Sequence, residues 1–529
     1  MEKFEGKQII GGTFSASGTE SFAAVDRTSG QKLPYIFYKA TNKEAGLAAS
    51  KAGSAFAAVR NKTGAEKAAF LDAIVNEITA ITEDLVHIAS LESALPEARI
   101  RSEKDRTLNQ IRLFASLLRD GYWVDARIET ADPSRSPIPK PDIRSMQRPL
   151  GPVVVFGASN FPLAFSVAGG DTISAFAAGC PVIFKAHSAH PATCELVGKA
   201  IVRASEQCGM PSGIFSMLYG DGAVVGSMLV QHPAIKAVAF TGSYKAGKAI
   251  FDTAVKRPEP IPVYAEMGST NPVFVLPEAM KQRAESIAAG YSAALTLGVG
   301  QFCTNPGLLI HQDGEHKDPF HSSLKSAFTN TKGGVMLAKN IETAYTDGIA
   351  ARKMVTGLEV MAEGVETDSP AHQQPVLFTT TFAEYNMHPE LEEELFGPSG
   401  IVISAGAKDD LLAFAEGLSG HLTATVHGTD DELPQYRDLV EILERKVGRV
   451  VINGFPTGVE VNHAMVHGGP FPACTDARCT SVGSAAIYRF TRPVCYQSFP
   501  QTLLPAELDN ANTLGIHRLV NGKITNTPI

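Results

Sequence analysis

The fold is best predicted from the stretch Gly151-Pro-Val-Val-Val-Phe156-Gly-Ala-Ser-Asn160, where an apolar run enters a loop of small residues. Similar apolar runs follow, each separated by a segment long enough for a helix: Val182–Phe184, Phe215–Leu218, Ala237–Phe240 and Val273–Leu276. Continuous Val, Ile and Phe runs between helices are typical of a parallel sheet that is buried on both faces. The sequence therefore predicts an α/β fold that binds its ligand beyond the carboxyl ends of these strands.

The segments before this stretch have other patterns. Residues 1–40 are rich in Gly, Ser and Thr and predict short strands and turns, whereas residues 42–120 are helical in pattern. One helix face carries the apolar residues Leu108, Ile111, Ala115 and Leu118. The charged residues Glu103, Lys104 and Asp105 are expected to face water. Residues 130–150 hold five prolines, which indicates an extended arm or linker.

Composition excludes several classes of protein. A chain of 529 residues is too long for one compact core, so two or three domains are expected. The net charge of −8 leaves no basic surface for nucleic acid or an anionic membrane, and we expect neither a signal peptide nor a membrane span. Seven cysteines without a CxxC pair favour a reducing cytoplasm and argue against a zinc site or a disulfide framework.

A candidate nucleophile stands in Gly298-Val-Gly-Gln-Phe-Cys303-Thr-Asn-Pro-Gly307, a glycine-rich loop that follows a predicted buried helix. A lone cysteine is most often a buried structural residue. Here the glycines would let the backbone approach a substrate closely, and a thiolate is a strong nucleophile when its pKa is tuned by neighbours. Cys303 is therefore the first candidate for covalent catalysis.

Four more motifs accompany Cys303 in a fixed order: Ser159-Asn160-Phe161-Pro162, Phe240-Thr-Gly-Ser243, Val263-Tyr-Ala-Glu266 and Glu394-Leu-Phe396-Gly397-Pro398. Together they resemble the aldehyde dehydrogenase superfamily over roughly residues 5 to 500. The resemblance implies a Rossmann-type nucleotide-binding domain (1–130 and 151–270), an α/β catalytic domain (271–470) and a small oligomerisation arm (131–150 and 484–500). It also implies a homodimer or homotetramer in which the arm pairs between subunits, and Ala486–Phe490 is the predicted C-terminal strand of that arm.

The resemblance assigns the catalytic roles. Cys303 would attack the aldehyde, the Asn160 amide and the Cys303 backbone N–H would bind the oxyanion, and Glu266 would activate the water that hydrolyses the thioester. We expect burial to raise the pKa of Glu266, as suits a general base. No metal is required, and the fourteen histidines form no HxH or HExxH pattern.

Cofactor-binding residues follow from the same resemblance. Gly242 and Ser243 would meet the pyrophosphate at a helix start, and Glu394 and Phe396 would hold the nicotinamide ribose and ring. Lys185 would bind the adenine ribose. NAD-preferring members often have a glutamate three residues further on, where this chain has Ser188. A 2′-phosphate is better accommodated by a hydroxyl beside a lysine than by a carboxylate. We therefore expect NADP as the preferred cofactor, with NAD as the alternative.

Several departures point to one branch of the superfamily. The chain has Ala158-Ser159-Asn160 where many members have Pro-Trp-Asn, and His467-Gly-Gly where an aromatic residue is commoner. A lysine common after Asn160 is replaced by Gly169-Gly170-Asp171. These features are similar to a branch that includes 2,5-dioxopentanoate (α-ketoglutarate semialdehyde) dehydrogenases and an NADP-linked fatty aldehyde dehydrogenase.

The leading hypothesis is thus NADP-linked oxidation of 2,5-dioxopentanoate to 2-oxoglutarate. His463, His467 and Arg478 are candidates for a cationic mouth that attracts the anionic substrate. The first alternative is a long-chain aldehyde dehydrogenase, which would need an apolar tunnel instead. A CoA-acylating enzyme is disfavoured because Glu266 is present. Two further alternatives are a papain-like cysteine hydrolase and a non-catalytic oligomeric scaffold.

Overall fold

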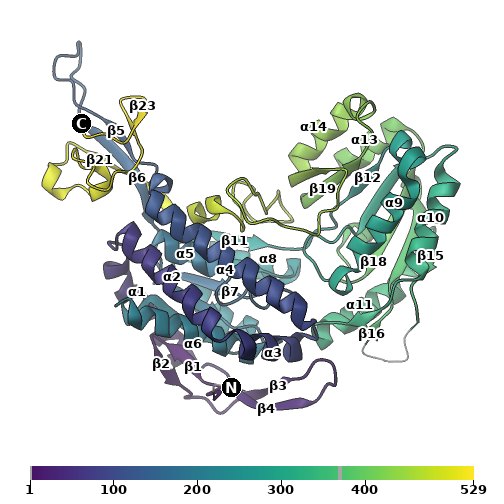
Figure 1. The fold of residues 1–529 in the computed structure, drawn as a ribbon, viewed down its shortest axis with the longest axis horizontal. Coiled ribbons are helices and arrows are strands. Elements are labelled where there is room, and N and C mark those ends of the chain that lie inside the picture. The colour runs from purple at the N-terminus through teal and green to yellow at the C-terminus, as the bar shows by residue number, and fades with distance from the viewer. Residues whose placement is uncertain (1–2, 367–371) are drawn as a thin grey trace.

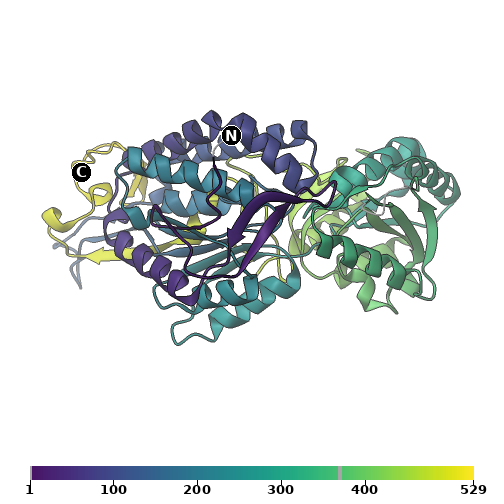
Figure 2. The ribbon, with the colours of Figure 1, turned by 90° about the horizontal axis from the view of Figure 1, so that it is seen from below.

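The computed structural model describes residues 3–366 and 372–529. Two α/β bodies lie side by side, and a small sheet projects from the first (Figures 1 and 2). Each body is built on a sheet of seven strands, and the projecting sheet has five. The fold is therefore α/β, as the apolar runs predict. None of the described helices is long and apolar enough to cross a membrane.

The sheet of the first body has the strand order β11-β10-β7-β8-β9-β1-β2. Its parallel core contains four of the five predicted runs, with one further strand at the edge: β7 (Val153–Phe156), β8 (Val182–Lys185), β9 (Phe215–Leu218), β10 (Ala237–Thr241) and β11 (Val263–Glu266). The N-terminal strands close the other edge in antiparallel register: β1 (Gln8–Ile10) and β2 (Thr13–Ser15). The hairpin β3 (Ser21–Val25) and β4 (Lys32–Tyr38) lies beside them.

Alternate residues of these strands pack against opposite helical layers. Val153 and Val155 join a core with the helices α2 to α6, whereas Val154 and Phe156 join a second core with α1 and α7. The helices are α1 (Asn42–Val59), α2 (Gly64–Ala80), α3 (Thr82–Ser93), α4 (Glu97–Asp120), α5 (Gly170–Ala178), α6 (Pro191–Gln207), α7 (Ser227–Gln231) and α8 (Tyr244–Val255). This two-sided burial explains why the strands are apolar at most positions on both faces.

The second body repeats this plan with the strand order β15-β17-β18-β13-β12-β19-β20. Its strands are β12 (Val273–Val275), β13 (Leu308–Gln312), β15 (Glu359–Glu363), β17 (Val376–Thr381), β18 (Ser399–Ala405), β19 (His421–His427) and β20 (Val447–Ile452). The run Val273–Leu276 thus belongs to this sheet. Helices cover both faces: α9 (Pro277–Thr296) and α10 (Lys317–Thr329) on one, and α12 (Phe382–Tyr385), α13 (Lys408–Gly417) and α14 (Arg437–Lys446) on the other. The helix α11 (Lys339–Arg352) and the small pair β14 (Gly334–Val335) and β16 (His372–Gln373) complete this body.

The projecting sheet has the order β21-β6-β5-β22-β23. It joins the proline-rich arm to the chain's end: β5 (Arg127–Glu129), β6 (Ile143–Pro149), β21 (Thr491–Gln497), β22 (Arg518–Val520) and β23 (Lys523–Thr525). One expectation was wrong here: residues 484–490 form a 3-10 helix, and the strand begins at Thr491. The chain after Pro500 is tied to the same sheet, because β22 pairs with β5 and Leu508 is fully buried.

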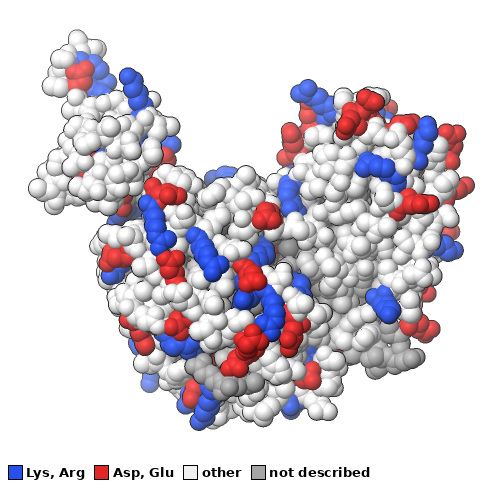
Figure 3. Space-filling view, viewed as in Figure 1, with Lys and Arg blue, Asp and Glu red and all other residues white. Residues whose placement is uncertain are grey.

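Charges on the face drawn in Figure 3 are of both signs and interspersed, as the composition predicts. One buried charge was missed. Glu103 was expected to face water, but its carboxylate accepts hydrogen bonds from the backbone N–H groups of Leu163 and Ala164, both at 2.9 Å. Its second oxygen pairs with Arg99 at 2.7 Å. Glu103 thereby fixes the loop that follows Asn160.

Candidate active site

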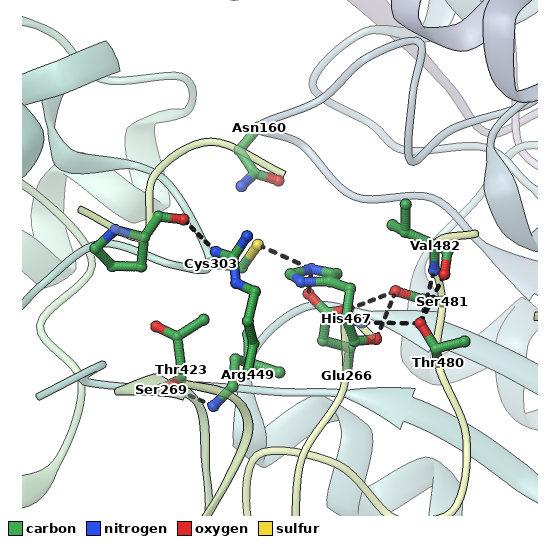
Figure 4. A network of polar contacts seen from close by, with 12 residues as sticks. Asn160, Glu266, Ser269, Cys303, Thr423, Arg449, His467, Thr480, Ser481 and Val482 are labelled. Atoms are coloured by element: carbon green, nitrogen blue, oxygen red, sulfur yellow. Dashed lines mark hydrogen bonds and ion pairs between the residues drawn. The ribbon is translucent and has the colours of Figure 1, made fainter. Parts of the chain in front are cut away.

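The site lies where the carboxyl end of the first sheet meets the second body. Glu266 is the last residue of β11, and Cys303 follows α9 on the loop that enters β13. The segment after β20 brings His467 between them, and Figure 4 shows the three side chains converging. Three stretches distant in sequence thus meet at one point.

The Cys303 loop has an unusual backbone conformation. Gly298, Val299 and Gly300 all have φ between 57° and 66°, a left-handed region that glycine adopts at little cost. A Cβ on Gly300 would lie 2.3 Å from the backbone of Gly397, so only glycine fits where the loop passes Phe396-Gly397-Pro398. Asn271 then fixes the loop, because its side-chain amide donates to the carbonyl oxygens of Cys303 and Asn305, both at 2.9 Å.

The three titratable groups form a compact triangle. His467 Nε2 lies 3.4 Å from the Cys303 sulfur and 3.0 Å from Glu266 Oε1. The Ser481 hydroxyl donates to the other Glu266 oxygen at 2.9 Å. Since one imidazole nitrogen faces both acidic groups, a proton on Nε2 stabilises the carboxylate and the thiolate alike.

The protonation of this triangle differs from the expectation for Glu266. Burial acts to raise the pKa of Glu266, but the charge and hydrogen bond of His467 and the hydroxyl of Ser481 hold it below its ordinary value. The expected rise was therefore wrong, because the sequence did not reveal this partner. Burial raises the pKa of the Cys303 thiol well above its ordinary value, and the charge of Glu266 raises it further. Of these two acids, Glu266 therefore loses its proton more readily than the Cys303 thiol.

Asn160 lies above Cys303 in Figure 4. Its side-chain amide donates to the carbonyl oxygen of Gln301 at 3.1 Å, two residues before the nucleophile. An amide nitrogen has two N–H groups, so one remains for an oxyanion at Cys303. The fixing of its loop by Glu103 holds this donor in place.

The cofactor-binding candidates line the same end of the first sheet. Ser243 begins α8, and its side chain accepts from the Ala246 N–H. Gly242 and Ser243 are exposed, so the first N–H groups of this helix are open to an anion. Ser188 is also exposed, three residues beyond Lys185.

A buried lysine and a half-buried glutamate fit a dinucleotide. The side chain of Lys185 is buried, its ammonium has no hydrogen-bond partner among the described residues, and burial lowers its pKa to about 8. Ribose hydroxyls would supply the missing acceptors. Glu394 approaches Gly268, where an added Cβ would lie 2.9 Å from its carboxylate. Burial, with the charge of Glu266, raises the pKa of Glu394 to about 8. Phe396 follows on the same loop, half-buried.

The donor atoms of Glu266, Cys303 and His467 lie within 4.8 Å of one another, a set that zinc would accept. A metal bound there would occupy the nucleophile itself. Glu266 and His467 line a small pocket together with the buried ion pair between Asp171 and Arg489. Asp171 stands in the segment that replaces the superfamily's lysine.

The three residues of the expected cationic mouth have different surroundings. His467 lies inside the triangle, His463 is exposed, and Arg478 is paired with Asp476 while its side chain is 89% exposed.

The sequence reasoning missed Ser481 and two arginines near Cys303, Arg106 and Arg449. An arginine inside the apolar strand Val447–Ile452 was the one signal available for Arg449.

Comparisons with known proteins show which family the chain is similar to. A model of the aldehyde dehydrogenase family matches residues 14–471. Alpha-ketoglutaric semialdehyde dehydrogenase 2 of Azospirillum brasilense is 46% identical over 98% of this chain and 99% of its own. Alpha-ketoglutaric semialdehyde dehydrogenase of Acinetobacter baylyi is 46% identical over 99% of this chain and 100% of its own. The crystal structure of betaine aldehyde dehydrogenase from Staphylococcus aureus in complex with NAD+ has a TM-score of 0.79 at 20% identity, covering 94% of this chain and 96% of that one.

Proposed function

Because the chain belongs to the aldehyde dehydrogenase family, we propose that it oxidises 2,5-dioxopentanoate to 2-oxoglutarate, with NADP preferred over NAD. One observation carries the proposal: the Cys303, His467 and Glu266 triangle stands in a chain that is 46% identical to two alpha-ketoglutaric semialdehyde dehydrogenases over nearly its full length. The triangle supports the reaction, and the two relatives support the substrate.

The first step forms a bond between the Cys303 sulfur and the aldehyde carbon. The thiol proton passes to the Glu266 carboxylate, because His467 Nε2 already directs its own proton to Glu266 Oε1 at 3.0 Å. Glu266 then releases the thiol proton to solvent and is ionised again for the hydrolysis step. As the carbonyl oxygen becomes negative, the free N–H of the Asn160 amide and the Cys303 backbone N–H donate to it. Each such donor typically contributes about 10²- to 10³-fold in rate. The product is a thiohemiacetal on Cys303.

NAD(P), when bound, supplies the acceptor for the hydride that the substrate carbon loses. Lys185 and Ser188 would hold its adenine ribose, Gly242 and Ser243 its pyrophosphate, and Glu394 and Phe396 its nicotinamide end. The adduct left on Cys303 is a thioester. Glu266, ionised under the influence of His467 and Ser481, takes a proton from the water that attacks this thioester and releases the acid.

The preference for NADP rests on the surroundings of Lys185. Ser188 presents a hydroxyl where a carboxylate would repel a 2′-phosphate. The nearby carboxylate of Asp221 is paired with Lys39 at 2.9 Å, which reduces its repulsion of an anion. Ser188→Glu should therefore raise the KM for NADP relative to that for NAD.

A homodimer or homotetramer is part of the proposal, and so is a reducing cytoplasm. All seven cysteines are free thiols. Cys180, Cys194 and Cys474 are buried, and Cys303 is partly buried. A nucleophilic thiol stays active where thiols remain reduced.

Steady-state kinetics test the proposal directly. We expect a kcat/KM for 2,5-dioxopentanoate at least tenfold above that for dodecanal, and a higher value with NADP than with NAD. A preference for dodecanal would assign the chain to long-chain aldehyde oxidation. Failure of both aldehydes to reduce either cofactor would leave a scaffold role.

A further inference from the structure

Two partly buried arginines near the nucleophile, Arg106 and Arg449, have no ion-pair partner among the described residues. Arg449 projects from β20, and Figure 4 shows its side chain extending toward the part of the site that holds Cys303. Its Nη1 donates to the Gly458 carbonyl at 2.8 Å and its Nη2 to the Pro456 carbonyl at 2.5 Å. The buried Nε has no partner among the described residues. The Cys303 thiolate is the one group that acts to raise the pKa of Arg449 against burial.

Arg106 approaches the same place from α4. Its Nε donates to the Val459 carbonyl at 3.4 Å, and its guanidinium lies over the Phe165 ring, 5.5 Å from the centroid. Its Nη1 is buried, again without a partner in the part of the chain that the structure describes. The charges of Glu103, Cys303 and Glu266 all reach it, but Glu103 is already paired with Arg99.

One loop holds both guanidinium groups. The carbonyl oxygens of Pro456, Gly458 and Val459 orient Arg449 and Arg106, which leaves their remaining donors directed elsewhere. Neutral carbonyl oxygens do not compensate two buried positive charges. A bound anion would do so, and a planar guanidinium matches a carboxylate better than any other side chain.

We propose that Arg106 and Arg449 together bind the carboxylate of the substrate and thereby select a short oxo acid over an uncharged aldehyde. This inference rests on the proposed function, since it assumes that Cys303 receives the aldehyde end of the same molecule. The selectivity acts in both directions. The anion gains charge-assisted hydrogen bonds, whereas a long alkyl chain would bury two unpaired cations. This assignment takes the place of the cationic mouth expected from His463, His467 and Arg478.

Kinetics with matched substrates and variants test the pair. Arg449→Met and Arg106→Met should each raise the KM for 2,5-dioxopentanoate about 10- to 100-fold while changing kcat less, since a hydrogen bond to a charged group is lost. The KM for pentanal, of equal length and no charge, should stay within about twofold or fall. Arg449→Lys should recover part of the loss. The control Arg478→Met removes an exposed cation and should change the KM of neither substrate.

A second readout does not depend on turnover. Iodoacetate and iodoacetamide alkylate Cys303 with the same geometry but differ in charge. The rate of alkylation by iodoacetate divided by the rate by iodoacetamide should fall at least fivefold in Arg449→Met and stay constant in Arg478→Met. A constant ratio in both arginine variants, or an equal rise of KM for pentanal, would overturn the inference. If the wild type instead failed to favour 2,5-dioxopentanoate over dodecanal while the ratio fell as expected, the proposed substrate alone would be wrong.

Discussion

At the scale of single residues, His467 governs the protonation of the site. Its Nε2 contacts both the base and the nucleophile, and its charge is the main influence that opposes the burial of Glu266. A histidine here replaces the aromatic residue common in the superfamily, so the triangle is a property of this chain's own sequence.

The variant His467→Phe removes that influence. Burial would then dominate, so the pKa of Glu266 would rise and the carboxylate would ionise only at higher pH. We expect kcat/KM to fall about 10- to 100-fold near neutral pH, and the acidic limb of its pH profile to move upward. His463→Phe, which changes an exposed histidine, should leave the profile in place. An unchanged acidic limb in His467→Phe would show that Glu266 titrates independently of the imidazole.

At the scale of elements, the loop that carries Asn160 depends on a helix far from it in sequence. Glu103 of α4 accepts from two N–H groups of this loop and is fully buried. Glu103→Gln would replace a charged acceptor and weaken the pair with Arg99. We expect about 1–3 kcal/mol less stability, measured by urea unfolding, together with a lower kcat.

Asp105→Asn is the matched control on the same helix. Its side chain is 67% exposed and pairs only with Lys104 on the surface, so stability and kcat should stay nearly unchanged. If Glu103→Gln lost no stability, the two backbone hydrogen bonds would contribute less than their burial implies.

The strands of the first sheet could be predicted from the sequence because burial on both faces produces apolar runs, which are visible in the local sequence alone. The sequence could not predict that Glu103 is buried, because a buried and a solvated carboxylate look the same within the charged run Glu103-Lys-Asp. The Cys303 and Glu266 motifs were found through local patterns. His467 stood out as a departure, but its contacts with both arise only when three distant segments meet. Arg106 and Arg449 were missed for the same reason.

At the scale of the whole molecule, the projecting sheet has two open edges, β21 and β23. Large apolar side chains are exposed on it and on the segments that connect its strands: Ile138 (69%), Leu503 (67%) and Ile524 (77%). Exposed edge strands and apolar groups are typical of surfaces that another chain covers. This supports a homo-oligomer built through the arm.

Ile524→Asp places a charge on the edge strand β23. Analytical ultracentrifugation should show a dimer or tetramer for the wild type and a shift toward smaller species for the variant. Met354→Asp, at an exposed residue of the second body, is the control. A wild type that sediments as a monomer would remove the arm's assigned role.

The most direct test of the central claim uses Glu266→Gln and the intact mass of the protein. With NADP and 2,5-dioxopentanoate, the variant should form the thioester but hydrolyse it slowly, so the mass should rise by one acyl group. Peptide mapping should place that group on Cys303, and Cys303→Ala should show neither adduct nor turnover while binding NADP nearly as tightly. An adduct on another cysteine, or turnover by Cys303→Ala, would contradict the assignment of Cys303 as the nucleophile.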